Sequence, residues 1–379
     1  NQASDKIGKI YAAQNGILGV LSRQLFDCAN LNQEELNQLY HTPGGAFGSC
    51  RYKLKTDEEF KQLVEVFKEY NIGYFFYNGG GDSQDTTWKI SERCRELGWP
   101  MQCIGIPKTI DNDLPLTDNC PGFGSVAKYV AISTLEAALD VASMAKNSTK
   151  VFVLEVMGRH TGWIAAAAGL AGQGEHQAPH IILFPEVHFN ETLFLDKVKH
   201  TVDTQGYCVI VASEGLRHEN GEFVSAQNRK DAFGHTQLGG VASYLCQLVQ
   251  DKHGFKHHHA VADYLQRSAR HIASQVDVEQ AFALGQFAVQ LALSGEHGRM
   301  PIIVRESNHP YQWRIDSAPL SEVANIEKHL PQDYIRDDGM GITQACREYM
   351  LPLIQGEAYP PYQNGLPHYL QKNIINHHY

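Results

Sequence analysis

Short apolar runs with the length of buried strands alternate with longer helical stretches through most of this chain. The strand-like runs cover 73–77, 101–106, 151–156, 180–184, 207–212 and 259–262, and the helical stretches cover 84–97, 123–145, 161–172, 191–203, 237–250 and 276–294. This alternation predicts parallel β-sheets with right-handed helical crossovers. At 379 residues the chain is long enough for two domains. The fold class we expect is therefore α/β, and we expect the proline-containing remainder, residues 301–379, to wrap the second domain.

Composition and charge restrict the function. A formal net charge of −10 argues against a nucleic-acid surface, which needs a basic footprint. The eight cysteines form no CxxC pair, as expected of reduced thiols in a cytosolic enzyme rather than of zinc or disulfide frameworks. No apolar run approaches the roughly 18 residues that span a bilayer, and no signal-peptide pattern opens the chain. We expect a cytoplasmic protein with neither nucleic-acid nor membrane partners.

A glycine-rich loop, Asn78-Gly-Gly-Gly-Asp82-Ser83, follows the strand-like run 73–77 and precedes a helical stretch. Consecutive glycines let backbone N–H groups approach an anion, and the helix N-terminus favours negative charge. Glycine clusters also end strands for purely conformational reasons, so this loop alone does not identify a site. The chain has no GxxxxGK[ST] motif and no GxGxxG after an early strand, which disfavours Walker-type nucleotide folds and nicotinamide dehydrogenases.

A second loop, Pro107-Lys-Thr-Ile-Asp-Asn-Asp113, follows the strand-like run 101–106. It places Asp111 and Asp113 beside Lys108 at the C-terminal end of a strand, where ligands bind in open α/β sheets. One carboxylate can take the proton of an attacking hydroxyl while a second holds a magnesium ion. The alternative is a purely structural turn in which the Asp side chains hydrogen-bond to their own backbone. A calcium loop is excluded, because Leu114-Pro115 breaks its pattern.

Further strand ends carry groups that suit phosphates and sugars. In the segment from Glu155 to Trp163, Arg159 can fork onto phosphate oxygens and Gly158 lets a ligand approach the backbone. Glu214 ends another strand and can receive sugar hydroxyls. Tyr264 and Arg267 follow a further strand and can clamp a second phosphate.

Two more basic segments complete the set. Arg51 lies in a glycine-rich segment, Gly44-Gly-Ala-Phe-Gly48-Ser-Cys-Arg51. The run 257–259 consists of three histidines, but neighbouring residues on a strand point to opposite faces, so one metal cannot readily take all three. We interpret these histidines as structural or as phosphate donors.

Together these motifs resemble the 6-phosphofructokinase family, and within it the pyrophosphate-dependent branch. GGGDS, PKTIDND, EVMGRHTGW, SEG and YLQR occur in the family's order and approximate spacing, from about residue 11 to about residue 295. The resemblance implies two similar Rossmann-like three-layer domains with mostly parallel sheets and the active site in the cleft between them. It implies a phosphoryl-donor domain of residues 1–122 plus about 266–300, and a fructose-6-phosphate domain of about 123–265 plus 301–379.

The implied reaction is reversible, magnesium-dependent phosphoryl transfer from pyrophosphate to the 1-hydroxyl of fructose 6-phosphate, a step of glycolysis. Asp111 resembles the family's base, and Lys108 acts beside it. The residues implied to bind fructose 6-phosphate are Thr109, Asp113, Met157, Gly158, Arg159, Glu214, Tyr264 and Arg267. Those implied to bind or select the donor are Arg51, Gly80, Gly81, Asp82, Ser83 and Lys108.

Donor choice depends on two positions. Family members that use ATP generally carry glycine where this chain has Lys108 and, in the alignment we prefer, Asp82. An aspartate there repels the α-phosphate of ATP, and Lys108 supplies positive charge against the transferring group. In another register Asp82 is a magnesium ligand, whereas the preferred register puts Gly81 at the family's metal carboxylate. Both assignments of Asp82 stay open.

The resemblance also implies a shared site. The family takes two arginines from a neighbouring subunit onto the 6-phosphate, and counting back from Arg159 and Arg267 gives Lys150 and His258. We therefore expect a homodimer or homotetramer. The family's first strand and glycine-rich donor loop, which precede the stretch matching residues 10–21, have no counterpart in the sequence. They either lie outside this chain or are lacking from the protein.

Two other functions compete with this reading. One is an ATP-dependent 6-phosphofructokinase of the same fold, and the other is a non-catalytic regulatory subunit that binds sugar phosphates.

Overall fold

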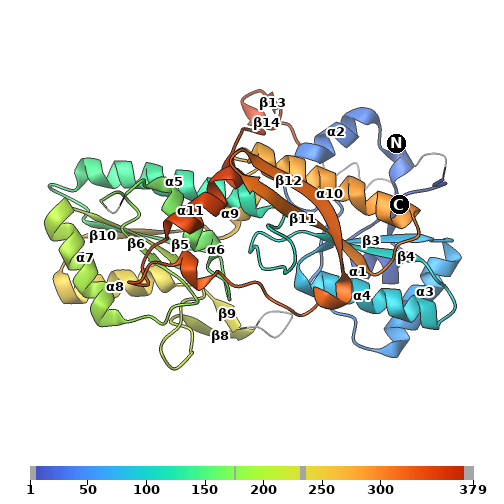
Figure 1. Cartoon of the computed structure of the whole chain (residues 1–379), viewed down its shortest axis with the longest axis horizontal. Helices are drawn as coiled ribbons and strands as arrows, with labels where there is room; N and C mark the ends of the chain where they lie inside the picture. Colours follow the sequence, from blue (N-terminus) through green and yellow to red (C-terminus); the bar gives the residue numbers. More distant parts are fainter. Residues whose placement is uncertain (1–5, 175, 231–235, 371–379) are drawn as a thin grey trace.

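The computed structural model describes residues 6–174, 176–230 and 236–370, which form two α/β bodies side by side (Figure 1). Each body has a four-stranded sheet at its centre, in the order β12-β11-β4-β3 in the first and β10-β5-β7-β6 in the second. The second sheet is wholly parallel, as the alternation predicts. This arrangement confirms the predicted α/β class.

The first sheet joins parallel and antiparallel strands. Its members are β3 (Tyr74–Gly79), β4 (Gln102–Pro107), β11 (Arg299–Asn308) and β12 (Tyr311–Pro319). Strands β3, β4 and β11 run parallel, while β12 returns antiparallel to β11. The helices around it are α3 (Asp57–Glu69), α4 (Gly81–Glu96) and α10 (Gln275–Leu293). Helix α3 begins with a capping box, in which Thr56 and Glu59 satisfy each other's backbone N–H groups, and then buries an apolar stripe.

The second sheet is hydrophobic on both faces. Its strands are β5 (Val151–Val156), β6 (Ile181–Leu183), β7 (Cys208–Ser213) and β10 (His257–Val261). One face packs on α5 (Phe123–Met144) and α6 (Trp163–Ala167), and the other packs on α7 (Glu191–Gln205) and α8 (Val241–His253). Such two-sided burial explains why its inner strands read as continuous apolar runs.

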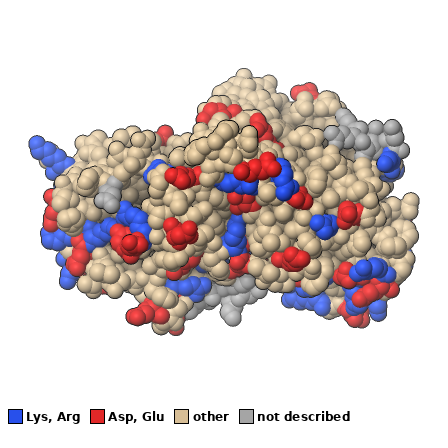
Figure 2. All heavy atoms as spheres, viewed as in Figure 1, with Lys and Arg blue, Asp and Glu red and all other residues tan. Residues whose placement is uncertain are grey.

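Smaller elements complete the chain. They are β1 (Tyr11–Ala13), α1 (Ile17–Leu21), β2 (Leu25–Asp27), α2 (Gln33–His41), β8 (Ala226–Lys230), β9 (Thr236–Leu238), α9 (Asp263–Ser268), α11 (Gln344–Met350), β13 (Tyr362–Gln363), β14 (Leu366–Pro367) and five 3₁₀ turns, η1 (Cys28–Asn30), η2 (Ala168–Ala171), η3 (Leu320–Glu322), η4 (Gln332–Tyr334) and η5 (Leu351–Ile354). No helix in the described ranges is long and apolar enough to cross a bilayer. Acidic and basic side chains intermingle on the face shown in Figure 2.

Two expectations about the elements need correction. Helix α8 begins at Val241 instead of about residue 237, because Gly239 and Gly240 have φ of 134° and 98°, outside the helical region. The C-terminal remainder does not only wrap the second body: β11 and β12 pair with β4 in the first sheet. Residues 299–319 thus lie with the first body, whereas the predicted division assigned residues 301–379 to the fructose-6-phosphate domain. The other predicted domain boundaries stay a prediction.

Candidate active site

The loop formed by residues 108–122 leaves the C-terminal end of β4 and leads into α5. Its own side chains fold it: Thr109 Oγ1 accepts from the Asp111 amide at 3.1 Å, and Asn112 Oδ1 accepts from the Cys120 amide at 2.9 Å. Asn112 is buried with φ of 56°, a left-handed conformation that asparagine tolerates. This turn carries Asp111 and Asp113 as rigid neighbours.

Asp111 has an environment that suits a general base. Burial, together with the charges of Asp113, Glu214 and Glu327 and against the opposing charge of Arg267, raises the pKa of its carboxyl to about 7. Burial also raises the pKa of Asp113. A carboxylate that titrates near neutral pH can accept and return a proton readily.

Lys108 links the loop to the glycine-rich segment and to the second body. Its amide donates to the Gly79 carbonyl at 3.1 Å, which joins the ends of β3 and β4. Burial lowers the pKa of its ammonium, the charge of Arg267 lowers it further, and Asp111 opposes this effect. The structure therefore brings Lys108, Asp111 and Arg267 within electrostatic reach of one another.

The strand ends of the second body supply the opposite side of the site. Gly158 adopts φ of 135°, and a Cβ there would lie 2.6 Å from the Thr161 carbonyl oxygen, so the position requires glycine. Ser213 Oγ donates to the Gly158 carbonyl at 2.5 Å. Burial raises the pKa of Glu214, while the Gly158 amide and the Arg159 charge lower it. Glu214 and Arg159 therefore lie close together.

Two predicted residues come from α9, directly after β10. The guanidinium of Arg267 lies 4.0 Å from the ring centroid of Tyr264 and stacks on it. Gln266, between them in sequence, accepts a hydrogen bond from the Met157 amide at 3.3 Å. This bond ties α9 to the Met157–Arg159 turn, so the predicted sugar-phosphate residues share one wall.

The glycine-rich segment forms the start of α4. Gly80 is its N-cap and offers no side-chain acceptor, and a Cβ at Gly79 would collide with Ser83 Oγ at 2.0 Å. Asp82 is half exposed, and its Oδ1 lies 3.2 Å from the Nζ of Lys53. Sequence reasoning missed Lys53, because no motif surrounds it.

Two of the predicted sugar-phosphate residues, Lys150 and His258, lie apart from this wall. Lys150 directly precedes β5 and its Nζ donates to the Ala145 carbonyl, whereas Arg159 follows the strand's other end. A six-residue strand puts them about 20 Å apart. His258 pairs with Phe152 near the same end as Lys150, and its side chain is exposed. Arg51 is exposed in the segment before α3.

A carboxylate from α10, that of Asp277, caps the N-terminus of α5. Asp277 is buried and accepts from the amides of Gly122 and Ser125, at 2.9 and 3.0 Å, and from the Ser125 hydroxyl at 2.5 Å. It thereby fixes the end of the 108–122 loop. The sequence motifs gave no sign of this contact, which joins residues more than 150 positions apart.

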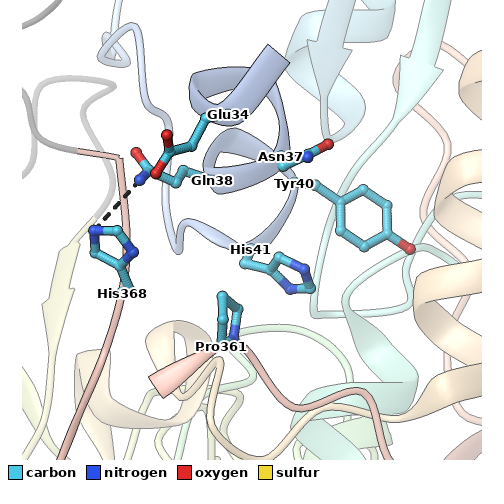
Figure 3. Close-up of a pocket in the computed structure, with 7 residues that line it drawn as sticks. All are labelled: Glu34, Asn37, Gln38, Tyr40, His41, Pro361 and His368. Carbon is cyan, nitrogen blue, oxygen red and sulfur yellow. Dashed lines mark hydrogen bonds between the residues drawn. The ribbon is translucent and has the colours of Figure 1, made fainter. Parts of the chain in front are cut away.

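A separate pocket of about 380 Å³ lies between α2 and the C-terminal hairpin (Figure 3). In it, Gln38 Nε2 and His368 Nε2 lie 3.3 Å apart. Its lining residues are Glu34, Asn37, Gln38, Tyr40, His41, Pro361 and His368. None of these residues belongs to the 108–122 loop or to the wall opposite it.

Known proteins resemble this chain along nearly its whole length. The family model described as Phosphofructokinase matches residues 2–292. A protein from Halomonas elongata named pyrophosphate–fructose 6-phosphate 1-phosphotransferase is 57% identical over 96% of this chain and 88% of its own length. A protein of the same name from Methylococcus capsulatus is 56% identical over 97% of this chain and 89% of its own length.

Solved structures give the same result. The crystal structure titled as a pyrophosphate-dependent phosphofructokinase from Marinobacter aquaeolei superposes with a TM-score of 0.90 at 55% identity. It covers 98% of this chain and 89% of that one. The chain belongs to the phosphofructokinase family.

Proposed function

We propose that this protein catalyses reversible phosphoryl transfer from pyrophosphate to the 1-hydroxyl of fructose 6-phosphate, giving fructose 1,6-bisphosphate and phosphate. The observation that carries the proposal is Asp111, a carboxylate whose pKa burial raises to about 7, within reach of the charges of Lys108 and Arg267. The relatives at 54–57% identity carry the name of this activity.

The chemistry is positioning combined with electrostatics. Asp111 accepts the proton of the 1-hydroxyl as its oxygen attacks the phosphoryl group in line, and in the reverse direction it returns that proton. The cation of Lys108 offsets negative charge on the transferring group. The sugar phosphate is held by Arg159 and Arg267, whose guanidinium groups can fork onto phosphate oxygens, and Glu214 receives sugar hydroxyls.

Magnesium is part of the proposal. In the described ranges no three His, Cys, Asp or Glu side chains cluster closely enough to hold a metal by themselves. Magnesium commonly binds one or two carboxylates and completes its shell with water and substrate phosphates, so this donor set fits it. Asp82 would hold the ion in one predicted register, and Asp113 keeps a carboxylate oxygen, Oδ1, without a hydrogen-bond partner. Bound magnesium would neutralise charge on the donor phosphates.

Pyrophosphate is favoured over ATP by charge at the donor side. Asp82 stands at the start of α4, paired with Lys53 and half exposed, where it can repel a further phosphate. The competing function, an ATP-dependent kinase of the same fold, requires this position to accept a nucleotide. Lys108 and Asp82 are thus the proposed donor-selecting residues.

A neighbouring copy is expected to complete the sugar-phosphate site. Lys150 and His258 lie at the far end of the second sheet from Arg159, so within one chain they cannot act on the same phosphate. A homodimer or homotetramer could bring them to a partner's site. Eight free thiols suit the reducing cytoplasm, which is the compartment we propose.

The deciding experiment measures phosphate release by the purified protein from pyrophosphate, with and without fructose 6-phosphate and magnesium. The proposal requires release that depends on both. Turnover with ATP alone would establish the rival kinase. Binding of fructose 6-phosphate without turnover under either donor would establish a non-catalytic subunit.

A further inference from the structure

A segment beyond the family-matched region lies across the candidate site. Residues 325–330, here called the strap, connect η3 to η4, whereas the family model ends at residue 292. The strap touches the 108–122 loop directly: the amide of Lys328 donates to the Asp113 carbonyl at 2.7 Å. Its neighbour Glu327 is close enough to act electrostatically on Asp111 and Asp113.

The side chain of Lys328 adds two hydrogen bonds between strap and loop. Its Nζ donates to the carbonyl oxygens of Thr117 and Asp118 at 3.0 and 2.8 Å. It also lies 5.4 Å from the ring centroid of Trp163, whose Nε1 donates to the Lys328 carbonyl at 3.0 Å. Burial lowers the pKa of this ammonium. A buried ammonium is costly unless its N–H groups are hydrogen-bonded, so Lys328 depends on these two carbonyl groups. The same bonds fix the position of the loop backbone at Thr117 and Asp118.

The strap is attached to both bodies. Asn325 Nδ2 donates to Oδ1 of Asp85 on α4 at 3.0 Å, in the first body. Glu327 pairs with His160 Nδ1 at 2.9 Å, in the second body. The strap therefore spans the two walls and holds the loop between them.

At its other end the strap shares an acceptor with the second body. Glu186 Oε1 accepts from the amides of Leu330 and Gly162, at 3.1 and 2.9 Å. Gly162 is the N-cap of α6, so this end of the strap is fixed to a regular element.

We propose that the strap holds the 108–122 loop in its reactive position and that Lys328 is the positioning residue. The proposal rests on the proposed function, because it assigns Asp111 the task of accepting the proton. Lys328 acts through the loop backbone and touches no reacting atom. An error of about 1 Å in the placement of a catalytic group can cost on the order of 100-fold in rate, so the loss of these bonds should appear in turnover.

The test compares Lys328→Met with Lys128→Met. Lys128 is also buried and its Nζ donates to the Gly356 carbonyl and to Glu357, but it lies on α5 outside the site. Both variants lose a buried ammonium and are expected to unfold at lower temperature. Only Lys328→Met should lose about 10–100-fold in kcat, with the KM values for both substrates within about threefold of wild type. A folded Lys328→Met variant with a kcat loss no larger than that of Lys128→Met would overturn the proposal.

Hydrogen exchange provides a readout that does not depend on activity. Amides of residues 111–119 should exchange faster in Lys328→Met than in Lys128→Met, at matched distance from the unfolding midpoint. If wild-type protein shows no turnover, the proposed function fails while this measurement still tests the strap. Equal exchange in the two variants would refute the strap in either case.

A milder variant covers the case in which Lys328→Met does not fold. Asn325 is exposed with φ of 61°, so Asn325→Gly removes its bond to Asp85 without backbone strain. Asn364→Gly is the matched control, since Asn364 is exposed with φ of 52° in the β13–β14 turn. We expect kcat to fall at least about threefold in Asn325→Gly alone. The same kcat in both glycine variants would contradict the proposal.

Discussion

Arg305 grips the carboxylate of Asp118 with two parallel hydrogen bonds, Nε to Oδ1 at 3.0 Å and Nη2 to Oδ2 at 2.9 Å. The pair joins β11 to the 108–122 loop, and both side chains are about 15% exposed or less. A planar guanidinium matches a carboxylate in this bidentate geometry. The 108–122 loop is thus held by a residue of the first sheet as well as by the hydrogen bonds of its own side chains.

Breaking this pair should cost stability. Asp118→Asn leaves a largely buried guanidinium without its counter-charge, so we expect the free energy of unfolding to fall by about 3 kcal/mol in urea titrations. The control is Asp316→Asn, because the Arg314–Asp316 pair is half exposed and water screens its charges, so its loss should change stability far less. Equal losses in the two variants would contradict a special role for the buried pair.

Asp111→Asn should abolish most turnover without impairing binding. Base action appears mainly in the transition state, so kcat should fall by about 10²–10⁴ while the KM for fructose 6-phosphate changes little. Steady-state assays with saturating pyrophosphate and magnesium measure both quantities. An unchanged kcat would remove Asp111 from the mechanism.

The rate should fall on the acid side of neutrality. A base must be deprotonated, and the pKa of Asp111 is raised to about 7 by burial and neighbouring carboxylates, so kcat/KM should rise with pH and level off above pH 7. Glu327→Gln removes one negative charge that raises this pKa, so the acid limb should move to lower pH. Glu348→Gln, an exposed change on α11, should leave the limb in place. A limb at the same pH in all three proteins would exclude the influence of Glu327.

Asp111→Asn should also stabilise the fold above neutral pH. The carboxyl titrates at about 7 in the folded protein and near 3.8 when unfolded, so the folded state binds the extra proton between these values. Stability contributed by this group therefore decreases as pH rises from about 4 to 7, and the penalty is complete above 7. Thermal unfolding at pH 8 should show a midpoint at least about 2 °C higher in the variant, with a smaller difference at pH 5 and little difference near pH 4. A lower unfolding midpoint of the variant at pH 8 would show that the ionised Asp111 carboxylate does not destabilise the folded protein.

Replacing both Lys108 and Asp82 with glycine tests donor selection. The double variant lacks the cation near the transferring group and the carboxylate at the start of α4, so turnover with pyrophosphate should drop at least about tenfold and turnover with ATP should rise. Parallel assays with each donor measure the ratio. If the double variant keeps full activity with pyrophosphate, neither residue selects the donor.

The second body was predictable because its signals are local. Strand β5 occupies residues 151–156 as expected, since continuous apolar runs mark strands buried on both faces. Glycines and charged residues at strand ends then located Arg159 and Glu214, because the ends of the parallel strands β5 and β7 meet at one edge of this sheet. The same kind of signal located Asp111 after β4 of the first sheet. A pattern within a few residues suffices for each of these inferences.

Other parts of the site depend on contacts that no local pattern reveals. Lys328 binds the carbonyl of Asp118 across 210 positions of sequence, and Lys53 meets Asp82 from a segment without a motif. The β11–β12 hairpin was missed because its prolines argued for irregular structure, although Arg299–Asn308 pairs with β12 throughout most of its length. Partner choice over such distances is fixed by tertiary packing.

Asp277 already occupies the N-terminus of α5, so the positive end of that dipole is neutralised from within the protein. The first turn of α4 is different: its N-cap, Gly80, has no side-chain acceptor, and its acidic residue, Asp82, is half exposed and lies 3.2 Å from the Nζ of Lys53. The two helix starts therefore differ, because a buried carboxylate caps α5 and no side chain caps α4. An anion that approaches the start of α4 meets no capping side chain there, whereas the start of α5 already holds the Asp277 carboxylate, so the two helix starts are not interchangeable as binding positions.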